Sequence, residues 1–302
     1  MTRAGTQAEP AGATSPGDIL RCPHCRAPLQ RLGRVYRCAN GHCFDVARQG
    51  YVNLLSPSRR HSRAPGDNRE MVLARRRVLD SGRYLPVAGQ VNAAVLAALP
   101  NSTRLESATI LDAGAGEGYY LAQLVAALSG SATAGQPHYY GVDVSRFGMQ
   151  YATHRTKSVT WLVASVVDLP LAGASLDVVV SIFAPLAPEE FRRVLQPDGA
   201  LIVATPGPDH LRALREMLYP TLRPHRPEAS LREIAPFFVL ATEQAVQYEA
   251  ELATPALVGD MLTMTPFGWN IDSERRRRAE AAAPLRTAMD VVIRTYRPVP
   301  GP

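Results

Sequence analysis

The amino-acid sequence predicts an α/β fold, a doubly wound and mostly parallel sheet preceded by a small N-terminal zinc-binding domain. The first observation is the spacing of Cys22, Cys25, Cys38 and His42, which is that of a tetrahedral zinc site. The second is the alternation of short apolar strands with helices further along the chain, where the first strand ends in a glycine-rich turn. The 302 residues, 46% of them hydrophobic, suffice for one large domain and one small one.

Charge and hydropathy narrow the class of protein. The net charge is +6 and nearly all of the 33 basic residues are arginine, which suits phosphate, although GC-rich codons also enrich arginine. All uninterrupted apolar runs are short, so we expect no membrane span. Residues 1–18 lack the apolar stretch of a signal peptide, and we expect a disordered tail in a cytoplasmic protein. Residues 297–302 form a second tail.

The cysteines and the histidine near the N-terminus form the most specific motif. Twelve residues separate the pair Cys22 and Cys25 from the pair Cys38 and His42, a span that lets a short hairpin gather four ligands. Ordinary buried thiols and a surface histidine are the alternative, but the mostly polar and basic intervening residues could hardly form a core without a metal. Because protein atoms fill all four positions, we expect a structural site. Cys43 is either a substitute ligand for Cys38 or His42 or a small buried residue beside the site, and the second interpretation is favoured because His42 keeps the usual spacing and Cys43 does not.

Changes in composition indicate the domain boundaries. We assign the zinc-binding module to residues 19–55, a basic linker with a helix to residues 56–80, and the main domain to residues 81–296. The linker carries a cluster of basic side chains, namely Arg59, Arg60, His61 and Arg63.

Hydrophobic periodicity predicts the elements of the main domain. Two helices come first, one from about Asn68 to a break at Ser81-Gly82 and one over Leu85–Leu99. Alternating strands and helices follow, with strands starting at Thr109 and His138 and running over Val159–Ala164, Leu176–Ile182 and Ala200–Thr205, and helices over Leu121–Leu128 and from Glu189. This alternation predicts a parallel sheet.

The glycine-rich turn after the first strand predicts a ligand site. Glycines 114, 116 and 118 let the backbone approach a ligand at the carboxyl end of the strand. A dinucleotide fingerprint would need a glycine where Tyr119 stands, and a phosphate-binding loop would need a lysine followed by serine or threonine, which is missing. Asp143 ends the next strand, where a carboxylate can accept both hydroxyls of an adenosine ribose.

Three segments in this order resemble the class I S-adenosylmethionine-dependent methyltransferases over about residues 105–205. They are the turn that begins at Asp112, the acid Asp143, and the string from Arg193 to Leu201. The resemblance implies a Rossmann-like sheet that binds S-adenosylmethionine. The alternative is a Rossmann domain for another adenosine ligand, whose fingerprint spacing is not met.

With the zinc module in front, the chain resembles one family, the zinc-containing 23S rRNA (guanine-N1)-methyltransferases, from Arg21 to about Tyr296. This resemblance implies a structural zinc ion, a 23S rRNA hairpin as partner, a possible homodimer, and resistance to tylosin-type macrolides. The strings that carry it are Cys22–Cys25, Cys38–Asp45, Gly50–Leu55, Pro65–Asp67, Ala74–Arg76, Glu117–Tyr120, Ala204–Leu211 and Met264–Phe267.

The family resemblance also implies which residues contact the cofactor. Without it, Tyr84 would be read as a helix-end aromatic packed on the core and His210 as a helix-start residue facing solvent. With it, these two close over the cofactor and Asp143 holds the ribose. The complete predicted set is Tyr84, Asp112, Gly114, Gly116, Tyr120, Leu121, Asp143 and His210.

The chemistry asks the protein to hold guanine N1 in line with an already activated methyl group. Asp168 and Phe183 are the weak catalytic candidates, Asp168 as an acceptor near N1 and Phe183 as an aromatic that stacks on the base or belongs to the core. We name no general base. N1 lies on the pairing edge, so only an unpaired or flipped guanine can react.

Two other functions stay open at this stage. A small-molecule methyltransferase of antibiotic biosynthesis with a structural zinc is the rival enzyme, and a zinc-based RNA-binding protein with a decayed cofactor fold is the rival non-enzyme. In the leading hypothesis the zinc module grips RNA and is separable from cofactor binding. The run Arg275–Arg278 either adds charge toward RNA or is a solvated helix face.

Overall fold

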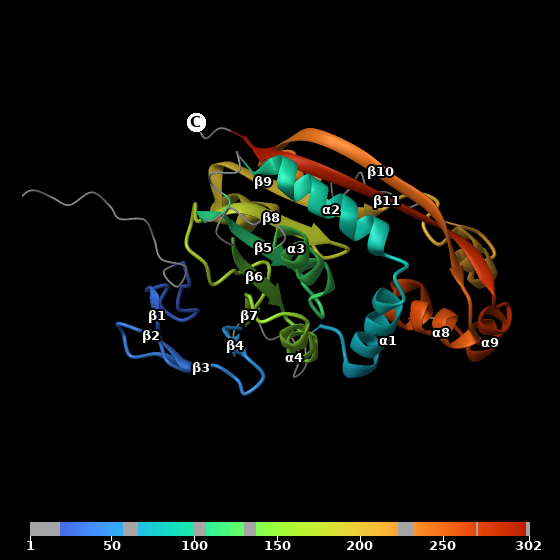
Figure 1. Cartoon of the computed structure of the whole chain (residues 1–302), viewed down its shortest axis with the longest axis horizontal. Helices are drawn as coiled ribbons and strands as arrows, with labels where there is room; N and C mark the ends of the chain where they lie inside the picture. The colour runs from blue at the N-terminus through green and yellow to red at the C-terminus, as the bar shows by residue number, and fades with distance from the viewer. Residues whose placement is uncertain are drawn as a thin grey trace, which may run out of the picture.

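The computed structural model describes residues 19–56, 66–99, 105, 107–129, 137–222, 232–269 and 271–299. Within them a large sheet with helices on its faces lies beside a small three-stranded sheet (Figure 1). The predicted N-terminal tail, residues 1–18, lies outside the described residues, as do residues 300–302 of the second tail. The same holds for the basic cluster of Arg59, Arg60, His61 and Arg63. None of the described helices has the length and apolarity that a membrane span needs.

The large sheet has the order β10-β11-β9-β8-β5-β6-β7-β4. Strands β4 to β9 run parallel where they pair, whereas β10 and β11 form an antiparallel hairpin that joins the sheet through β9. This confirms the doubly wound sheet. Its strands are β4 (Tyr51–Asn53), β5 (Thr109–Ala113), β6 (His138–Asp143), β7 (Val159–Val163), β8 (Leu176–Ile182), β9 (Leu195–Pro206), β10 (Phe238–Leu252) and β11 (Leu285–Pro298).

The predicted helices form within two residues of their expected bounds. Strand β9 begins five residues earlier than expected, because its pairing with β8 shifts register between Leu176 and Val178 and takes in the Gln196–Gly199 turn. The helices are α1 (Arg69–Asp80), α2 (Leu85–Ala98), α3 (Tyr119–Ser129), α4 (Arg146–Arg155), α5 (Pro188–Val194), α6 (Arg212–Leu218), α8 (Pro255–Met264), the 3-10 turn η3 (Pro266–Gly268) and α9 (Ser273–Ala281).

Each face of the large sheet carries its own apolar core. Neighbouring residues of β5 point to opposite faces, so Ile110 packs with residues of α2 and α3 while Leu111 packs with α5 and the N-terminal module. Both side chains are completely buried. The parallel strands are therefore apolar on both sides, which is why they read as continuous hydrophobic runs in the sequence.

The zinc-binding module is a three-stranded antiparallel sheet of β1 (Leu29–Leu32), β2 (Val35–Cys38) and β3 (Cys43–Asp45). It docks on the connection between β7 and β8. The Arg21 N–H donates to the Pro170 carbonyl at 2.8 Å, and the Ala172 N–H donates to the Ile19 carbonyl at 2.8 Å. The module is thus attached through backbone hydrogen bonds as well as through its apolar side chains.

Strand β4 joins the module to the large sheet. Tyr51–Asn53, which the sequence analysis assigned to the zinc module, pair in parallel with Trp161–Val163 of β7. We therefore propose a module boundary near residue 50 and not at residue 55. The helix of the predicted linker, α1, packs against α8 and belongs to the main body (Figure 1).

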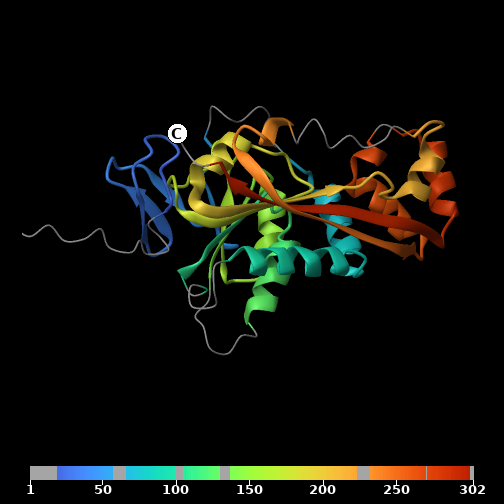
Figure 2. The same cartoon turned by 90° about the horizontal axis from the view of Figure 1, so that it is seen from above.

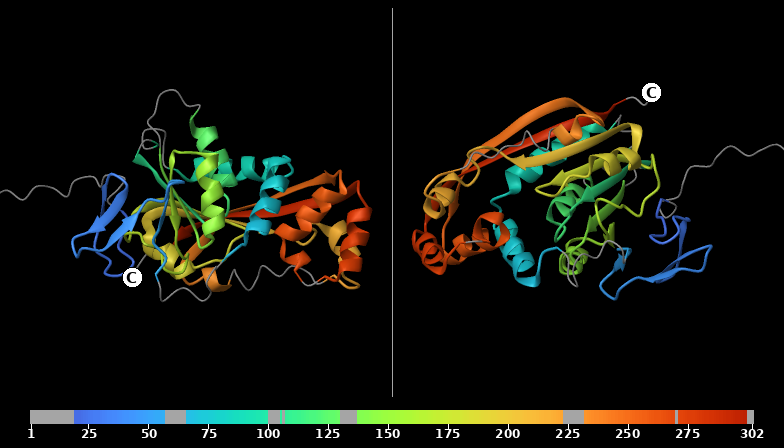
Figure 3. Two further views of the ribbon diagram at one scale, coloured as in Figure 1. Left: turned by 90° about the horizontal axis from the view of Figure 1, so that it is seen from below. Right: turned by 180° about the vertical axis from the view of Figure 1, so that it is seen from behind.

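A long β-hairpin carries a helical unit away from the large sheet. Strands β10 and β11 have 15 and 14 residues, and α8, η3 and α9 lie between them in the chain. We call these three elements, Pro255–Ala281, the helical cap. Figure 2 shows the hairpin running along the molecule to the cap, and Figure 3 shows the cap and the zinc module at opposite ends.

Candidate functional site

The four predicted metal ligands meet in one cluster. The Cys22, Cys25 and Cys38 sulfurs and a ring nitrogen of His42 lie within 4.8 Å of one another. The His42 Nδ1 atom is 3.5 Å from the sulfurs of Cys22 and Cys25 and 3.4 Å from that of Cys38, and the sulfurs of Cys25 and Cys38 are 3.8 Å apart. Ordinary Zn–S and Zn–N bond lengths in a tetrahedron give edges of about 3.8 Å between sulfurs and about 3.6 Å between sulfur and nitrogen. The residues therefore fit a zinc ion.

The surroundings of the cluster also favour bound metal. Hydrogen bonds from the Ala27 backbone N–H and from the Asn40 side chain lower the pKa of the Cys25 thiol to about 6. Such donors hold a thiolate ready for a metal ion and orient it. The expectation for Cys43 is wrong, because its side chain is exposed and donates to the Gly41 carbonyl. Its strand position, opposite Arg37 of β2, turns it to the solvent face of the small sheet.

The glycine turn after β5 forms the predicted cradle. Gly114 and Gly116 have φ angles of +90° and +56°, and a side chain at Gly114 would collide with Ala184. The Gly116 N–H donates to one oxygen of Asp143 at 2.9 Å, and the Ser145 N–H donates to the other at 2.7 Å. Burial raises the pKa of the Asp143 carboxyl, and these two hydrogen bonds oppose the shift. The carboxylate is thus fixed at the end of β6 with acceptor positions left for a ligand.

A second buried acid lies under the turn. Asp112 lines a small cavity with Tyr120 and Leu121. Burial, and then the charge of Asp143, raise the pKa of Asp112 to about 7. The hydroxyl of Tyr120 is buried and has no hydrogen-bond partner among the described residues. An unpaired buried hydroxyl beside a buried carboxylate indicates space for a polar, positively charged ligand, and S-adenosylmethionine fits that donor set.

Four aromatic rings meet beside the cradle. Phe183 stacks on His210 with ring centres 5.9 Å apart and meets Tyr84 edge-on at 6.0 Å, and Tyr120 is tilted against it at 6.5 Å. We call Tyr84, Tyr120, Phe183 and His210 the aromatic cluster. It unites three predicted cofactor contacts with one catalytic candidate, although they are far apart in the sequence.

Two members of the aromatic cluster, His210 and Tyr84, are buried and lie within hydrogen-bond distance of each other. His210 is 4% exposed, so it does not face solvent as its alternative interpretation expected. Its Nδ1 accepts from the Asp290 N–H at 3.3 Å, which assigns the ring proton to Nε2, 3.4 Å from the Tyr84 hydroxyl. Tyr84 itself is buried before the first turn of α2, so the packing and the ligand interpretations are both compatible with its position.

Phe183 is the exposed member. It is 39% exposed and has a φ of +51°, a backbone conformation that costs a bulky residue energy and that concentrates at functional sites. Its N–H donates to the Ala204 carbonyl, which anchors it at the end of β8. An exposed ring held in a strained conformation is not a core aromatic, so the stacking interpretation is favoured.

Asp168 and the late arginines have other neighbours. Asp168 forms an ion pair with Arg26 of the zinc module, whose guanidinium also donates to the Leu169 carbonyl at 3.1 Å. Asp168 thus helps to join the module to the main domain, and its catalytic role stays a prediction. In α9, Arg275 and Arg278 donate to carbonyls at the end of α6, at 3.4 Å to Leu218 and 2.5 Å to Met217.

Sequence reasoning missed the ion network that supports the glycine turn. Glu117 is completely buried and receives two hydrogen bonds from Arg155 of α4, at 2.7 and 2.8 Å. Arg155 also pairs with Asp80 of α1 at 2.5 Å. The sequence signal that could have revealed this network is Glu117 itself, an acid between two glycines of a buried turn. A buried carboxylate requires a cationic partner. The network ties the turn to two helices.

The fold and this site define a class I S-adenosylmethionine-dependent methyltransferase with an N-terminal zinc ribbon. Two family models agree: the one described as RlmA, N-terminal, a zinc ribbon, matches residues 20–63, and a methyltransferase domain matches residues 105–252. A 23S rRNA (guanine(748)-N(1))-methyltransferase of Streptomyces fradiae is 35% identical over 93% of this chain and 97% of its own. The chain belongs to this family of zinc-containing 23S rRNA (guanine-N1)-methyltransferases.

A second relative supports the family. A putative 23S rRNA (guanine-N(1)-)-methyltransferase of Micromonospora griseorubida is 33% identical over 93% of this chain and 97% of its own. Among solved structures, the YcgJ protein of Bacillus subtilis resembles 71% of this chain and 98% of its own, with 13% identity and a TM-score of 0.48.

Proposed function

We propose that this enzyme transfers a methyl group from S-adenosylmethionine to N1 of a guanine in a hairpin of 23S rRNA. The observation that carries the proposal is the aromatic cluster, with the exposed ring of Phe183, directly beside the glycine cradle. The names of both relatives, which specify guanine N1 of 23S rRNA, support the substrate. The proposal also takes Tyr84, Asp112, Gly114, Gly116, Tyr120, Leu121, Asp143 and His210 as the cofactor contacts.

The residues of the chain have three tasks in this reaction. When bound, S-adenosylmethionine supplies a sulfonium methyl group that is already activated for transfer. Asp143 and the turn orient the adenosine part, and Phe183 stacks on the flipped guanine so that N1 lies in line with the methyl carbon. Guanine N1 would release its proton to solvent and take the methyl group, and S-adenosylhomocysteine would leave with the electron pair of the broken carbon–sulfur bond.

The zinc module supports an RNA substrate by its charge. Residues 19–50 contain six arginines and a single acidic residue, Asp45. Arg31, Arg34, Arg37 and Arg48 are exposed. Arginine side chains bind phosphate groups through their planar fork. A strongly basic module therefore suits a polyanionic partner such as RNA better than it suits a small neutral substrate.

Three finer statements belong to the same proposal. Because one relative comes from a tylosin producer, we propose resistance to tylosin-type macrolides as the biological role. An enzyme acting on ribosomal RNA works where ribosomes are, so we propose a cytoplasmic location. The family resemblance also suggests a two-fold dimer, which light scattering of the purified protein would test.

Primer extension on 23S rRNA transcripts tests the proposal. N1 methylation blocks the pairing edge, so reverse transcriptase should stop at one guanine after incubation with enzyme and S-adenosylmethionine. The Phe183→Ala enzyme should give roughly 10- to 100-fold less stop at unchanged cofactor affinity, since stacking on a base is worth about 1–3 kcal/mol. No stop in any transcript or ribosomal subunit would refute the proposal.

Salt dependence separates the proposed function from a small-molecule methyltransferase. RNA binding through several phosphates should weaken about 10³-fold or more between 50 and 200 mM salt if six or more phosphates are contacted. A small neutral substrate would show almost no such dependence. A flat salt profile would favour the rival enzyme.

A further inference from the structure

Arg75 of α1 points at the glycine cradle and is not among the proposed cofactor contacts. Its guanidinium pairs with Asp67, which precedes α1, and donates to the Met264 carbonyl of the helical cap at 3.4 Å. A β-carbon placed on Gly116 would lie 3.5 Å from its Nη1 atom. One side chain therefore bridges the segment before α1, the cap and the turn.

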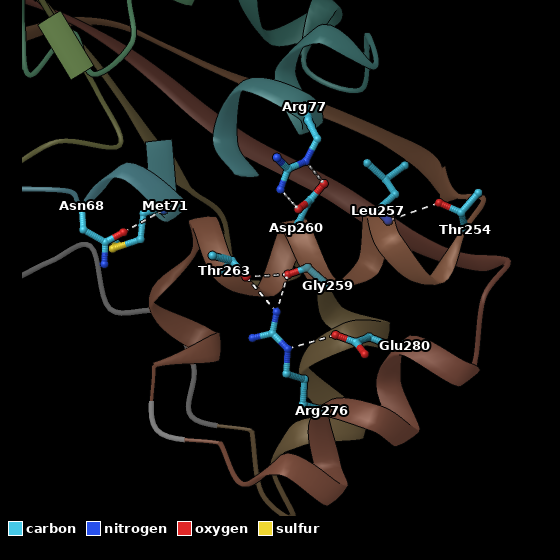
Figure 4. A network of polar contacts seen from close by, with 10 residues as sticks. All are labelled: Asn68, Met71, Arg77, Thr254, Leu257, Gly259, Asp260, Thr263, Arg276 and Glu280. Atoms are coloured by element: carbon cyan, nitrogen blue, oxygen red, sulfur yellow. Dashed lines mark hydrogen bonds and ion pairs between the residues drawn. The ribbon is translucent and has the colours of Figure 1, made fainter. Parts of the chain in front are cut away.

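The helix explains why the three arginines of the Arg75–Arg77 run have different surroundings. Successive residues of an α-helix point about 100° apart. Arg76 accordingly turns toward the Asp80 and Glu117 network, and Arg77 turns toward Asp260 of α8. Figure 4 shows the Arg77 pair with Asp260 beside the other polar contacts of the cap. The three consecutive arginines of α1 thus have three different sets of partners.

The guanidinium has hydrogen-bonding capacity beyond these contacts. It carries five N–H donors, and the two contacts named above use two of them. A carboxylate is the group that matches the remaining fork in a bidentate way. The side chain is 26% exposed, so a pair formed there is only partly screened by water.

The charges around the cradle match the two ends of an amino acid. Asp112, which lies in the small cavity with Tyr120, offers a carboxylate to an ammonium group. Arg75 offers a cation to a carboxylate at the Gly116 side of the turn. The methionine part of S-adenosylmethionine is a zwitterion with both groups on one carbon atom.

We propose that Arg75 binds the α-carboxylate of the methionine part of the cofactor and that Asp67 holds its guanidinium in position. This inference rests on the proposed position of the cofactor. It makes the segment before α1 and the cap part of the cofactor site, because each supplies one partner of Arg75.

Two ligands that differ only in this part test the proposal. S-adenosylhomocysteine carries the amino acid, whereas 5′-methylthioadenosine lacks it, and neither requires RNA or turnover. Titration calorimetry of Arg75→Ala should show roughly 10- to 100-fold weaker binding of S-adenosylhomocysteine, since a hydrogen bond to a charged group is worth about 1.5–3 kcal/mol. Binding of 5′-methylthioadenosine should change by less than about threefold.

Arg77→Ala is the matched control, because it removes the same charge from the same helix and should leave both affinities unchanged. Arg75→Lys keeps the charge and most of the side-chain length but loses the planar fork, and Arg75→Gln keeps the aliphatic stem but loses the charge. If Arg75→Ala fails to fold, both of these variants should weaken S-adenosylhomocysteine more than 5′-methylthioadenosine, and an equal effect on the two ligands would refute the proposal. Asp67→Asn should weaken only S-adenosylhomocysteine, by a smaller factor than Arg75→Ala.

Three results would overturn the assignment. Equal weakening of both ligands would show that Arg75 acts on the fold or on the adenosine part. An unchanged affinity for S-adenosylhomocysteine would show that Arg75 does not touch the carboxylate, and equal affinity of the wild-type protein for both ligands would show that the amino acid has no anchor. A failure of rRNA methylation with these affinities as expected would refute the proposed substrate alone.

Discussion

The zinc module and the helical cap occupy opposite ends of the molecule, and each extends one of the two apolar cores of the sheet. Leu20, Cys22 and Leu29 of the module share a core with Leu162 of β7, whereas Val258 and Met261 of the cap lie in the core of the other face. Both units are therefore continuous with the main body. The sequence expectation that the module is separable from the cofactor domain does not follow from this packing.

The two units differ in what holds their interiors together. A single metal site organises the module, since its ligands Cys22 and Cys38 are themselves core residues. The outer helix of the cap, α9, depends on polar contacts, because only its Ala279 is buried and its Arg276 and Arg278 donate to carbonyls of α8 and α6. A single substitution at the zinc site should therefore unfold the module, whereas each substitution in the cap should lower its stability by a small amount.

The largest expected effect is loss of the zinc site. Cys22→Ser should lower the melting temperature by roughly 10 °C or more, because structural zinc contributes folding energy directly and 1 kcal/mol shifts the midpoint of a domain this size by about 2–4 °C. Differential scanning calorimetry should show the main transition itself moving, since the core is shared. Cys43→Ser, an exposed cysteine that is no ligand, should change nothing. A small early transition with an unmoved main one would show that the module is independent after all.

The next largest effect is the pH dependence of ligand binding at Asp112, in the large sheet between the two units. Asp112 has a folded pKa of about 7, raised by burial and the charge of Asp143, so it is mostly protonated below pH 6. A ligand ammonium needs the ionised form, so S-adenosylhomocysteine should bind more tightly as pH rises through 7, approaching a tenfold gain per unit at the acidic side. Calorimetry from pH 6 to 8 measures the slope.

The same ionisation acts on stability with the opposite sign. Because the folded state of the free protein holds the Asp112 proton that the unfolded chain releases near pH 4, the free energy of unfolding should fall as pH rises from 4 to 7. Asp112→Asn should abolish the affinity slope and reduce the stability slope, to which the raised pKa of the buried Asp143 also contributes, while Arg276→Ala should keep both. A persistent affinity slope in Asp112→Asn would assign the titration to another group.

The cap should respond more weakly. Arg276 donates to the Gly259 carbonyl at 3.0 Å, to the Thr263 hydroxyl at 2.8 Å and to Glu280 at 2.9 Å (Figure 4). Arg276→Ala should lower the free energy of unfolding by about 1–2 kcal/mol, because partly exposed charged contacts are screened. Chemical denaturation measures the loss, and exposed Arg277→Ala should cost nothing measurable. A loss as large as that of Cys22→Ser would remove the contrast between the two units.

The smallest effect is expected at the seam of the zinc module. Arg26 is half exposed where it pairs with Asp168, so Arg26→Ala should cost at most about 1 kcal/mol and leave the melting transition single. Denaturation monitored by tyrosine or tryptophan fluorescence would reveal it. If Asp168→Asn instead reduced methylation at unchanged stability, the predicted catalytic role of Asp168 would be supported.

Local patterns were enough to predict that the zinc ligands come together and that Asp143 lies at the glycine turn, because each depends on short spacing that the backbone geometry preserves. Arg75 could not be found this way, since its direction depends on how α1 packs between the turn and the cap. The exposure of Cys43 and the joining of Tyr51–Asn53 to the large sheet are likewise decided by strand pairing across the chain. Contacts between segments that are far apart in the sequence could not be predicted from local patterns.

The most direct measurement of the central claim is nucleoside mass spectrometry of 23S rRNA after incubation with the enzyme and S-adenosylmethionine. The site described here predicts 1-methylguanosine as the methylated nucleoside, in an amount that falls in Phe183→Ala while S-adenosylhomocysteine affinity stays unchanged. Methylation of another base or another guanine atom, or an unmodified rRNA from an enzyme that binds S-adenosylhomocysteine normally, would contradict it.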